Sequence, residues 1–183
     1  MDTIVKKISY AMSLREPQSE ALDFLNHIVS GINFKTITKS DTERATIKRI
    51  AEQSATDNCE GGNTIKVADE FSFPSFCFEM ATGIGKTRLM GASIYYLFKT
   101  KGYKHFFILA PGDTIYEKLK KETVPNHPKY LFKGLEAEMG KPRVFCGEDY
   151  LKYNQLEFEA EKSSEIQLFI FNIGKIFTRG DVT

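Results

Sequence analysis

The chain has 183 residues, which suits a single domain with a buried core. Its formal net charge is +1, so no overall field attracts nucleic acid, and any contact with it would be local. No apolar run approaches the roughly 20 residues that cross a bilayer, and residues 1–7 lack the apolar centre of a signal peptide. These absences favour a cytoplasmic protein. The three cysteines form no Cys-x-x-Cys pair, which argues against a disulfide framework and a zinc site.

Residues 1–70 are predicted to form an N-terminal helical region. Glu16 and Pro17 open a helix, because proline suits the first helical turn, and apolar residues then recur at helical spacing up to Gly31, a plausible stop. A second helix is expected from about residue 40 to residue 50, and residues 54–64 are typical of a loop.

Residues 71–183 alternate between short apolar runs and helical patterns. Strands are predicted at 75–80, 105–110, 143–146 and 166–171, and we expect Cys77 of the first run to be a small core residue. Helices are predicted at 86–100, at 113–122 with Asp113 as its cap, and within 148–163. This alternation predicts an α/β fold in which helices cover both faces of a parallel sheet, with ligands bound beyond the carboxyl ends of the strands.

A glycine-rich loop lies between the first predicted strand and the first of these helices. Gly83 and Gly85 allow a tight turn that brings backbone N–H groups close to a phosphate. The helix that begins at Lys86 adds its unpaired N–H groups and the positive end of its dipole. Lys86 can reach the β- and γ-phosphates, and the Thr87 hydroxyl can ligate Mg²⁺. The loop therefore predicts that the chain binds a nucleoside triphosphate.

The loop resembles motif I of superfamily two helicases and translocases. The general phosphate-loop pattern has a glycine where this chain has Met80, and the early glycine is absent from that family's motif too. The resemblance implies a RecA-like ATP-binding domain with Mg²⁺ as cofactor and Lys86 as the catalytic residue. The expected nucleotide-binding residues are Gln18, Thr82, Gly83, Ile84, Gly85, Lys86, Thr87 and Arg88.

Three further segments occur along the chain in the same order as the corresponding motifs of that family. Residues 14–18 resemble its adenine-recognition element, in which the side chain of Gln18 would pair with adenine; a plain polar residue in a first helical turn is the alternative. Residues 108–114 resemble motif Ia, which implies DNA contacts at Pro111, Gly112 and Thr114, although an ordinary strand-to-helix turn would look similar. Residues 166–173, with residues 78–87, look like the restriction (Res) subunit of type III restriction–modification enzymes.

This resemblance implies the ATP-binding front part of a DNA-dependent translocase that acts in DNA restriction. Duplex DNA, bound weakly by these residues alone, and a methyltransferase or specificity subunit would be its partners. Motif II should follow a strand after the loop, yet the one Asp-Glu pair, Asp69-Glu70, precedes the loop. We therefore expect a domain cut short before motif II and inactive by itself. Two alternatives stay open, namely a small phosphoryl-transfer kinase and a module that binds ATP without hydrolysing it.

Overall fold

The computed structural model describes residues 1–30, 45–46, 48–50, 52–53, 57, 77–148 and 165–176. Contacts divide the chain into two compact units. The first contains Met1–Tyr10 and Leu14–Leu89, and the second contains Ala11–Ser13 and Met90–Thr183. The domain boundary expected near residue 70 lies outside the described residues, so the division at that point stays a proposal.

The first unit begins with two helices, α1 (Thr3–Ala11) and α2 (Glu16–Ser30). The predicted start of α2 at Glu16 is confirmed, whereas α1 was not predicted from the sequence. Each helix buries one apolar stripe, with Val5 and Ile8 fully buried on α1 and Leu22 fully buried on α2. Of the second expected helix, residues 45, 46 and 48–50 are helical, while its expected start lies outside the described residues.

The strand predicted at 75–80 is wrong for the residues that the structure describes. Residues 77–80 form no strand, and Cys77, expected in the core, is exposed. A strand requires a neighbour that accepts and donates its backbone hydrogen bonds, and no described strand pairs with this segment. The apolar composition of residues 75–80 therefore led to the wrong prediction of a buried strand. Helix α4 (Lys86–Lys101) follows the glycine-rich loop as predicted.

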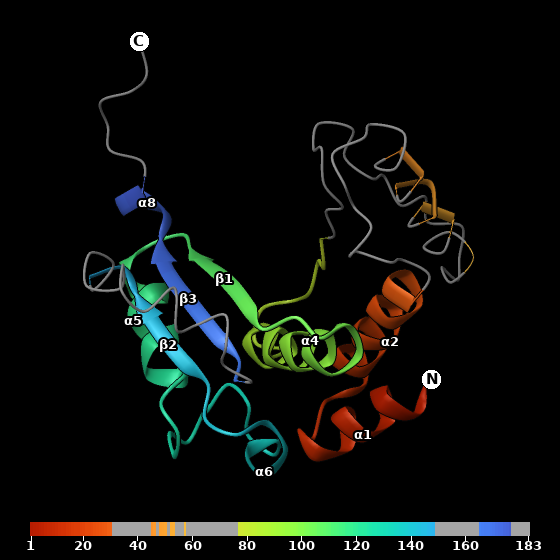
Figure 1. The fold of residues 1–183 in the computed structure, drawn as a ribbon, viewed down its shortest axis with the longest axis horizontal. Coiled ribbons are helices and arrows are strands. Elements are labelled where there is room, and N and C mark those ends of the chain that lie inside the picture. Colours follow the sequence, from red (N-terminus) through yellow and green to blue (C-terminus); the bar gives the residue numbers. More distant parts are fainter. Residues whose placement is uncertain are drawn as a thin grey trace. The chain divides into compact units, whose positions relative to one another are not determined.

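The second unit holds a three-stranded parallel sheet. Strands β1 (His105–Ala110), β2 (Arg143–Cys146) and β3 (Gln167–Asn172) lie in the order β1-β3-β2, so β3 is central (Figure 1). The predicted bounds of β1 and β2 are confirmed, and β3 is displaced by one residue. Helix α5 (Asp113–Glu122) contacts β1 and β3. The short helices α6 (Glu136–Met139) and α8 (Ile173–Ile176) complete the described unit.

The two faces of this sheet differ in burial. Ile108 and Ala110 of β1 are buried on the same face as Leu168 and Ile170 of β3. On the opposite face of β1, Phe107 is 60% exposed, and its ring stacks on that of Phe171 with centroids 5.0 Å apart. These parallel strands with their helices form a partial RecA-like α/β domain, as the sequence predicted. Most of the helix expected within 148–163 lies outside the described residues.

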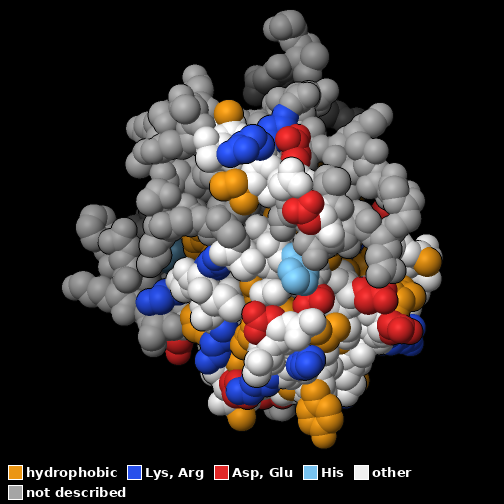
Figure 2. Space-filling view, turned by 90° about the vertical axis from the view of Figure 1, so that its right-hand side faces the viewer, with side chains coloured by type: hydrophobic (Ala, Val, Ile, Leu, Met, Phe, Trp, Pro, Cys, Tyr) orange, Lys and Arg blue, Asp and Glu red, His pale blue; other side chains and the backbone are white. Residues whose placement is uncertain are grey.

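None of the helices among the described residues is both long and apolar enough to span a membrane. Basic and acidic side chains occur together across the face shown in Figure 2. Among the described side chains that Figure 2 colours, charges of the two signs lie beside one another.

Candidate nucleotide-binding site

The glycine-rich loop at 81–87 forms a tight turn that leads directly into α4. Gly83 and Gly85 have φ values of +82° and +98°, a region of backbone conformation that residues with a Cβ rarely adopt. The carbonyl of Gly85 accepts the first hydrogen bonds of α4, from the backbone N–H of Arg88 at 2.9 Å and of Leu89 at 3.2 Å. Gly85 is therefore the residue that caps α4.

Lys86 is exposed at the start of α4, and its side chain folds back over the loop. Its Nζ donates a hydrogen bond to the backbone carbonyl of Ala81 at 2.9 Å. The ammonium group therefore lies across the mouth of the turn, where an incoming phosphate would compete with a neutral carbonyl for it. A charged acceptor is favoured in this competition because charge-assisted hydrogen bonds are about twice as strong as neutral ones.

The other expected nucleotide-binding residues of the loop lie within the same turn. Thr82 and Gly83 are exposed, whereas Ile84, Gly85, Thr87 and Arg88 are half-buried. The structure therefore brings this sequence-predicted group together at one helix N-terminus. Among the described residues, no three His, Cys, Asp or Glu side chains lie close enough to hold a metal ion. The role in Mg²⁺ binding predicted for Thr87 thus rests on its position directly after Lys86.

Gln18 reaches the loop from the first turn of α2. Its Oε1 accepts the backbone N–H of Arg15 at 2.8 Å, and its Nε2 donates to the carbonyl of Gly85 at 2.8 Å. The two partners fix the orientation of the amide, because one offers only a donor and the other only an acceptor. Gln18 is 2% exposed. The adenine contact predicted for Gln18 stays a prediction. In this conformation its amide already donates a hydrogen bond to the backbone of the loop.

Arg15 also contacts the loop, which the sequence did not indicate. Its Nη1 donates to the carbonyl of Gly83 at 3.4 Å. Arg15 precedes α2, and Gln18 is the third residue of that helix, so the bond from Gln18 back to the N–H of Arg15 is half of a capping box. Because the capping position holds arginine and not serine or threonine, the sequence signal for this cap is weak. The contacts with the loop, 67 and 68 residues away, could not have been predicted from the sequence.

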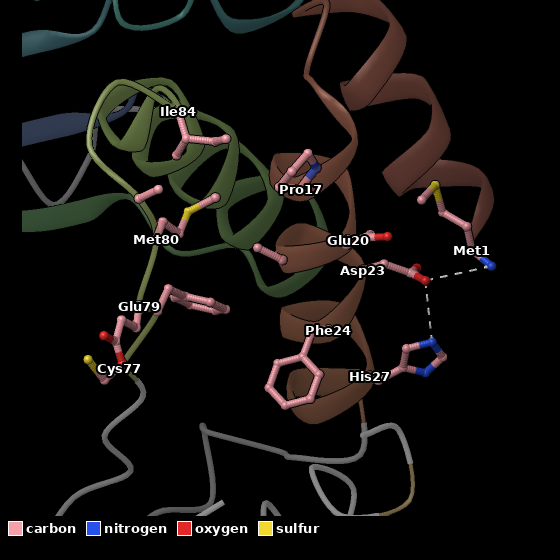
Figure 3. Close-up of a pocket in the computed structure, with 13 residues that line it drawn as sticks. Met1, Pro17, Glu20, Asp23, Phe24, His27, Cys77, Glu79, Met80 and Ile84 are labelled. Atoms are coloured by element: carbon pink, nitrogen blue, oxygen red, sulfur yellow. Dashed lines mark ion pairs between the residues drawn. The ribbon is translucent and has the colours of Figure 1, made fainter. Parts of the chain in front are cut away.

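A cavity of about 920 Å³ borders the loop within the first unit. Figure 3 shows Glu20, Asp23 and His27 on α2, with Glu79 and Met80 on the segment that leads into the loop. The Oδ2 of Asp23 lies 3.7 Å from the N-terminal amine of Met1, with which it forms an ion pair, and 3.6 Å from Nε2 of His27. The carboxylates on its walls disfavour a polyphosphate inside this cavity, because charges of the same sign repel one another.

The expected DNA-contacting residues lie in the second unit, where β1 turns into α5. Pro111 and Thr114 are exposed and Gly112 is half-buried. The expectation that Asp113 caps α5 is wrong, because Gly112 occupies the capping position and no side chain caps the helix. A glycine in extended conformation, with φ of −172°, leaves Asp113 as the first helical residue. Its carboxylate instead accepts a hydrogen bond from Asn172.

The fold and the loop together define the class of protein, a P-loop α/β domain of the RecA-like kind. Residues 11–180 match the family model described as "Type III restriction enzyme, res subunit", and the chain belongs to that family. A segment of 101 residues is 32% identical to the "Probable type III restriction-modification enzyme HindVIP Res subunit" of Haemophilus influenzae. The match covers 55% of this chain and 18% of that relative. No solved structure gives a significant match.

Proposed function

We propose that the loop at 81–87 binds the phosphates of ATP together with Mg²⁺. One observation carries this proposal: two glycines with positive φ turn the backbone directly into the N-terminus of a 16-residue helix that starts with an exposed lysine. Oriented N–H groups, the helix dipole and the Lys86 ammonium all favour an anion at the same place.

Each residue of the loop has a distinct part in this proposal. The backbone from Thr82 to Gly85 surrounds the β-phosphate, and Lys86 leaves the carbonyl of Ala81 to bridge the β- and γ-phosphates. The Thr87 hydroxyl would ligate Mg²⁺, and the half-buried Arg88 lies on the first turn beside it. Gln18 completes the site from α2. Lys86 is the proposed catalytic residue, because its ammonium group would place a positive charge on the phosphoryl group that is transferred.

Membership of the family allows a second proposal, which concerns the activity in which this domain takes part. We propose a DNA-dependent ATPase and translocase that acts in DNA restriction with a methylating or specificity subunit. Support comes from the family match and from the relative whose printed name is that of a restriction–modification subunit. Within this chain, the turn of Pro111, Gly112 and Thr114 is the proposed DNA contact, because it presents the exposed N-terminus of α5.

Isothermal titration of the 183-residue protein with MgATP tests the proposal. Lys86→Ala removes a charge-assisted hydrogen bond to phosphate and should weaken binding about tenfold or more. Lys6→Ala, which removes an exposed lysine on α1, is the matched control and should bind as the wild type does. Equal ATP affinity in the wild type and Lys86→Ala would rule out the assigned phosphate site. If the metal acts in the same site, the difference in ATP affinity between the wild type and Lys86→Ala should disappear when EDTA replaces Mg²⁺.

A further inference from the structure

Two residues at the start of α2 hold carbonyl groups of the glycine-rich loop. Gln18 Nε2 lies 2.8 Å from the carbonyl oxygen of Gly85, and Arg15 Nη1 lies 3.4 Å from that of Gly83. These are the two residues whose positive φ gives the loop its shape. Both contacts lie within the first unit, and both link segments that are far apart in the sequence.

Holding a carbonyl also fixes the N–H group that follows it. A trans peptide is planar, and its C=O and N–H bonds point in opposite directions. The bond from Gln18, together with the N–H groups of Arg88 and Leu89 that donate to the same carbonyl, therefore orients the N–H of Lys86. The contact from Arg15 holds an earlier peptide of the loop, whose N–H, that of Ile84, donates to the carbonyl of Ala81 at 3.5 Å. Glycine peptides turn more easily than others, because no Cβ restricts their rotation. Hydrogen bonds from outside the loop therefore restrict the rotation of these two peptides.

The position of Gln18 is itself well determined. Its amide is 2% exposed, and its Oε1 is held by the backbone N–H of Arg15 at 2.8 Å. A Cβ on Gly85 would overlap with Nε2 of Gln18, so the amide lies directly against the backbone of the loop. The bond at 2.8 Å is shorter than the contact of Arg15, and it should therefore have the larger effect.

We propose that Gln18, assisted by Arg15, is a positioning residue that holds the phosphate loop in its binding conformation whichever base the nucleotide carries. The proposal rests on the function assigned above to the loop. It differs from a contact between Gln18 and adenine, because a held loop affects every ligand that contains a polyphosphate. Loss of the bond loosens the loop even when no ligand is present.

The test compares Gln18→Met with the wild type in two measurements. Affinities for MgATP, MgGTP and magnesium tripolyphosphate should all fall by one common factor, about two- to tenfold, and Arg15→Ala should show a smaller common loss. Amide hydrogen exchange without ligand should speed up at residues 84 and 86. Ser19→Ala, the neighbouring residue on α2, is the control and should change neither measurement. Gln18→Glu keeps an acceptor for the N–H of Arg15, so it preserves the cap of α2 while removing the donor to Gly85; it should also speed up exchange in the loop.

Each outcome decides for or against the proposal. A loss confined to ATP, with tripolyphosphate binding unchanged, would assign Gln18 to the base and overturn the positioning role. Unchanged exchange at residues 84 and 86 in both Gln18 variants would overturn it as well. If the wild type binds none of the three ligands, the proposed phosphate site fails, whereas the exchange measurement still tests whether Gln18 holds the loop.

Discussion

Asn172 donates a hydrogen bond from Nδ2 to Oδ1 of Asp113 at 2.7 Å, linking the carboxyl end of β3 to the first residue of α5. The Oδ1 of Asn172 accepts the backbone N–H of Gly174 at 2.9 Å, so the amide also shapes the turn into α8. Asn172 is 6% exposed. A negative charge is therefore held at the helix N-terminus that we propose as a DNA contact, where it stabilises α5 and repels a phosphate.

Replacing this charge with a neutral amide should strengthen DNA binding. Asp113→Asn keeps an oxygen that can accept the hydrogen bond of Asn172, so the turn is preserved while one negative charge is removed. We expect affinity for labelled duplex DNA at low salt to rise about two- to fivefold, the effect of one exposed charge pair, and the gain to disappear as salt is raised.

Glu117→Gln removes the same charge one turn further along α5 and is the matched control. Its gain should be smaller, because the effect of the helix dipole falls off within the first turn. NMR shifts upon DNA addition should centre on residues 111–115. Equal gains in the two variants, or shifts elsewhere, would mean that DNA does not approach the turn after β1.

The sequence predicted those elements whose periodicity and end signals agree. Helix α5 and strand β1 were found at their observed bounds, because an apolar run ended by Pro111 and Gly112 leaves few alternatives. Residues 77–80 failed because an apolar run does not say whether a partner strand exists. The contacts of Asn172 and Arg15 also could not be predicted, since each joins residues about 60 or more positions apart whose proximity only the fold creates.

Gly91 should resist replacement by alanine although it lies inside α4. Alanine normally stabilises a helix interior by about 1 kcal/mol relative to glycine. A Cβ at this position would, however, overlap with the backbone carbonyl of Leu131, which cannot move aside as a flexible side chain can. We expect Gly91→Ala to lower the free energy of unfolding by about 1–3 kcal/mol, as overpacking does, measured by urea denaturation.

Ser93→Ala is the control on the same helix, two residues later. It gains helix propensity without filling space against a backbone, so it should leave stability unchanged or slightly higher. If Gly91→Ala is as stable as Ser93→Ala, then α4 does not pack closely against residue 131.

The hydroxyl of Tyr116 gives the second unit a measurable dependence on alkaline pH. Tyr116 is 1% exposed, and its hydroxyl oxygen accepts the backbone N–H of Gly147 at 3.1 Å. Burial is the main cause that raises the pKa of Tyr116 to about 12, and Cys146 and Glu148 add to it. Because the folded protein favours the neutral phenol, its contribution to stability is complete below the ordinary pKa of about 10. It should be lost as the pH rises from about 10 to about 12.

Tyr116→Phe isolates this contribution. At neutral pH the variant should be less stable by about 1 kcal/mol, since the N–H of Gly147 loses its acceptor. As the pH rises above 10, the wild type should lose stability faster than the variant, and the difference in free energy of unfolding between them should shrink. Tyr10, which is 89% exposed, supplies the control, and Tyr10→Phe should stay within about 0.5 kcal/mol of the wild type at neutral pH. A difference between the wild type and Tyr116→Phe that stays constant from pH 8 to pH 11.5 would show that the phenol is not held neutral by the fold.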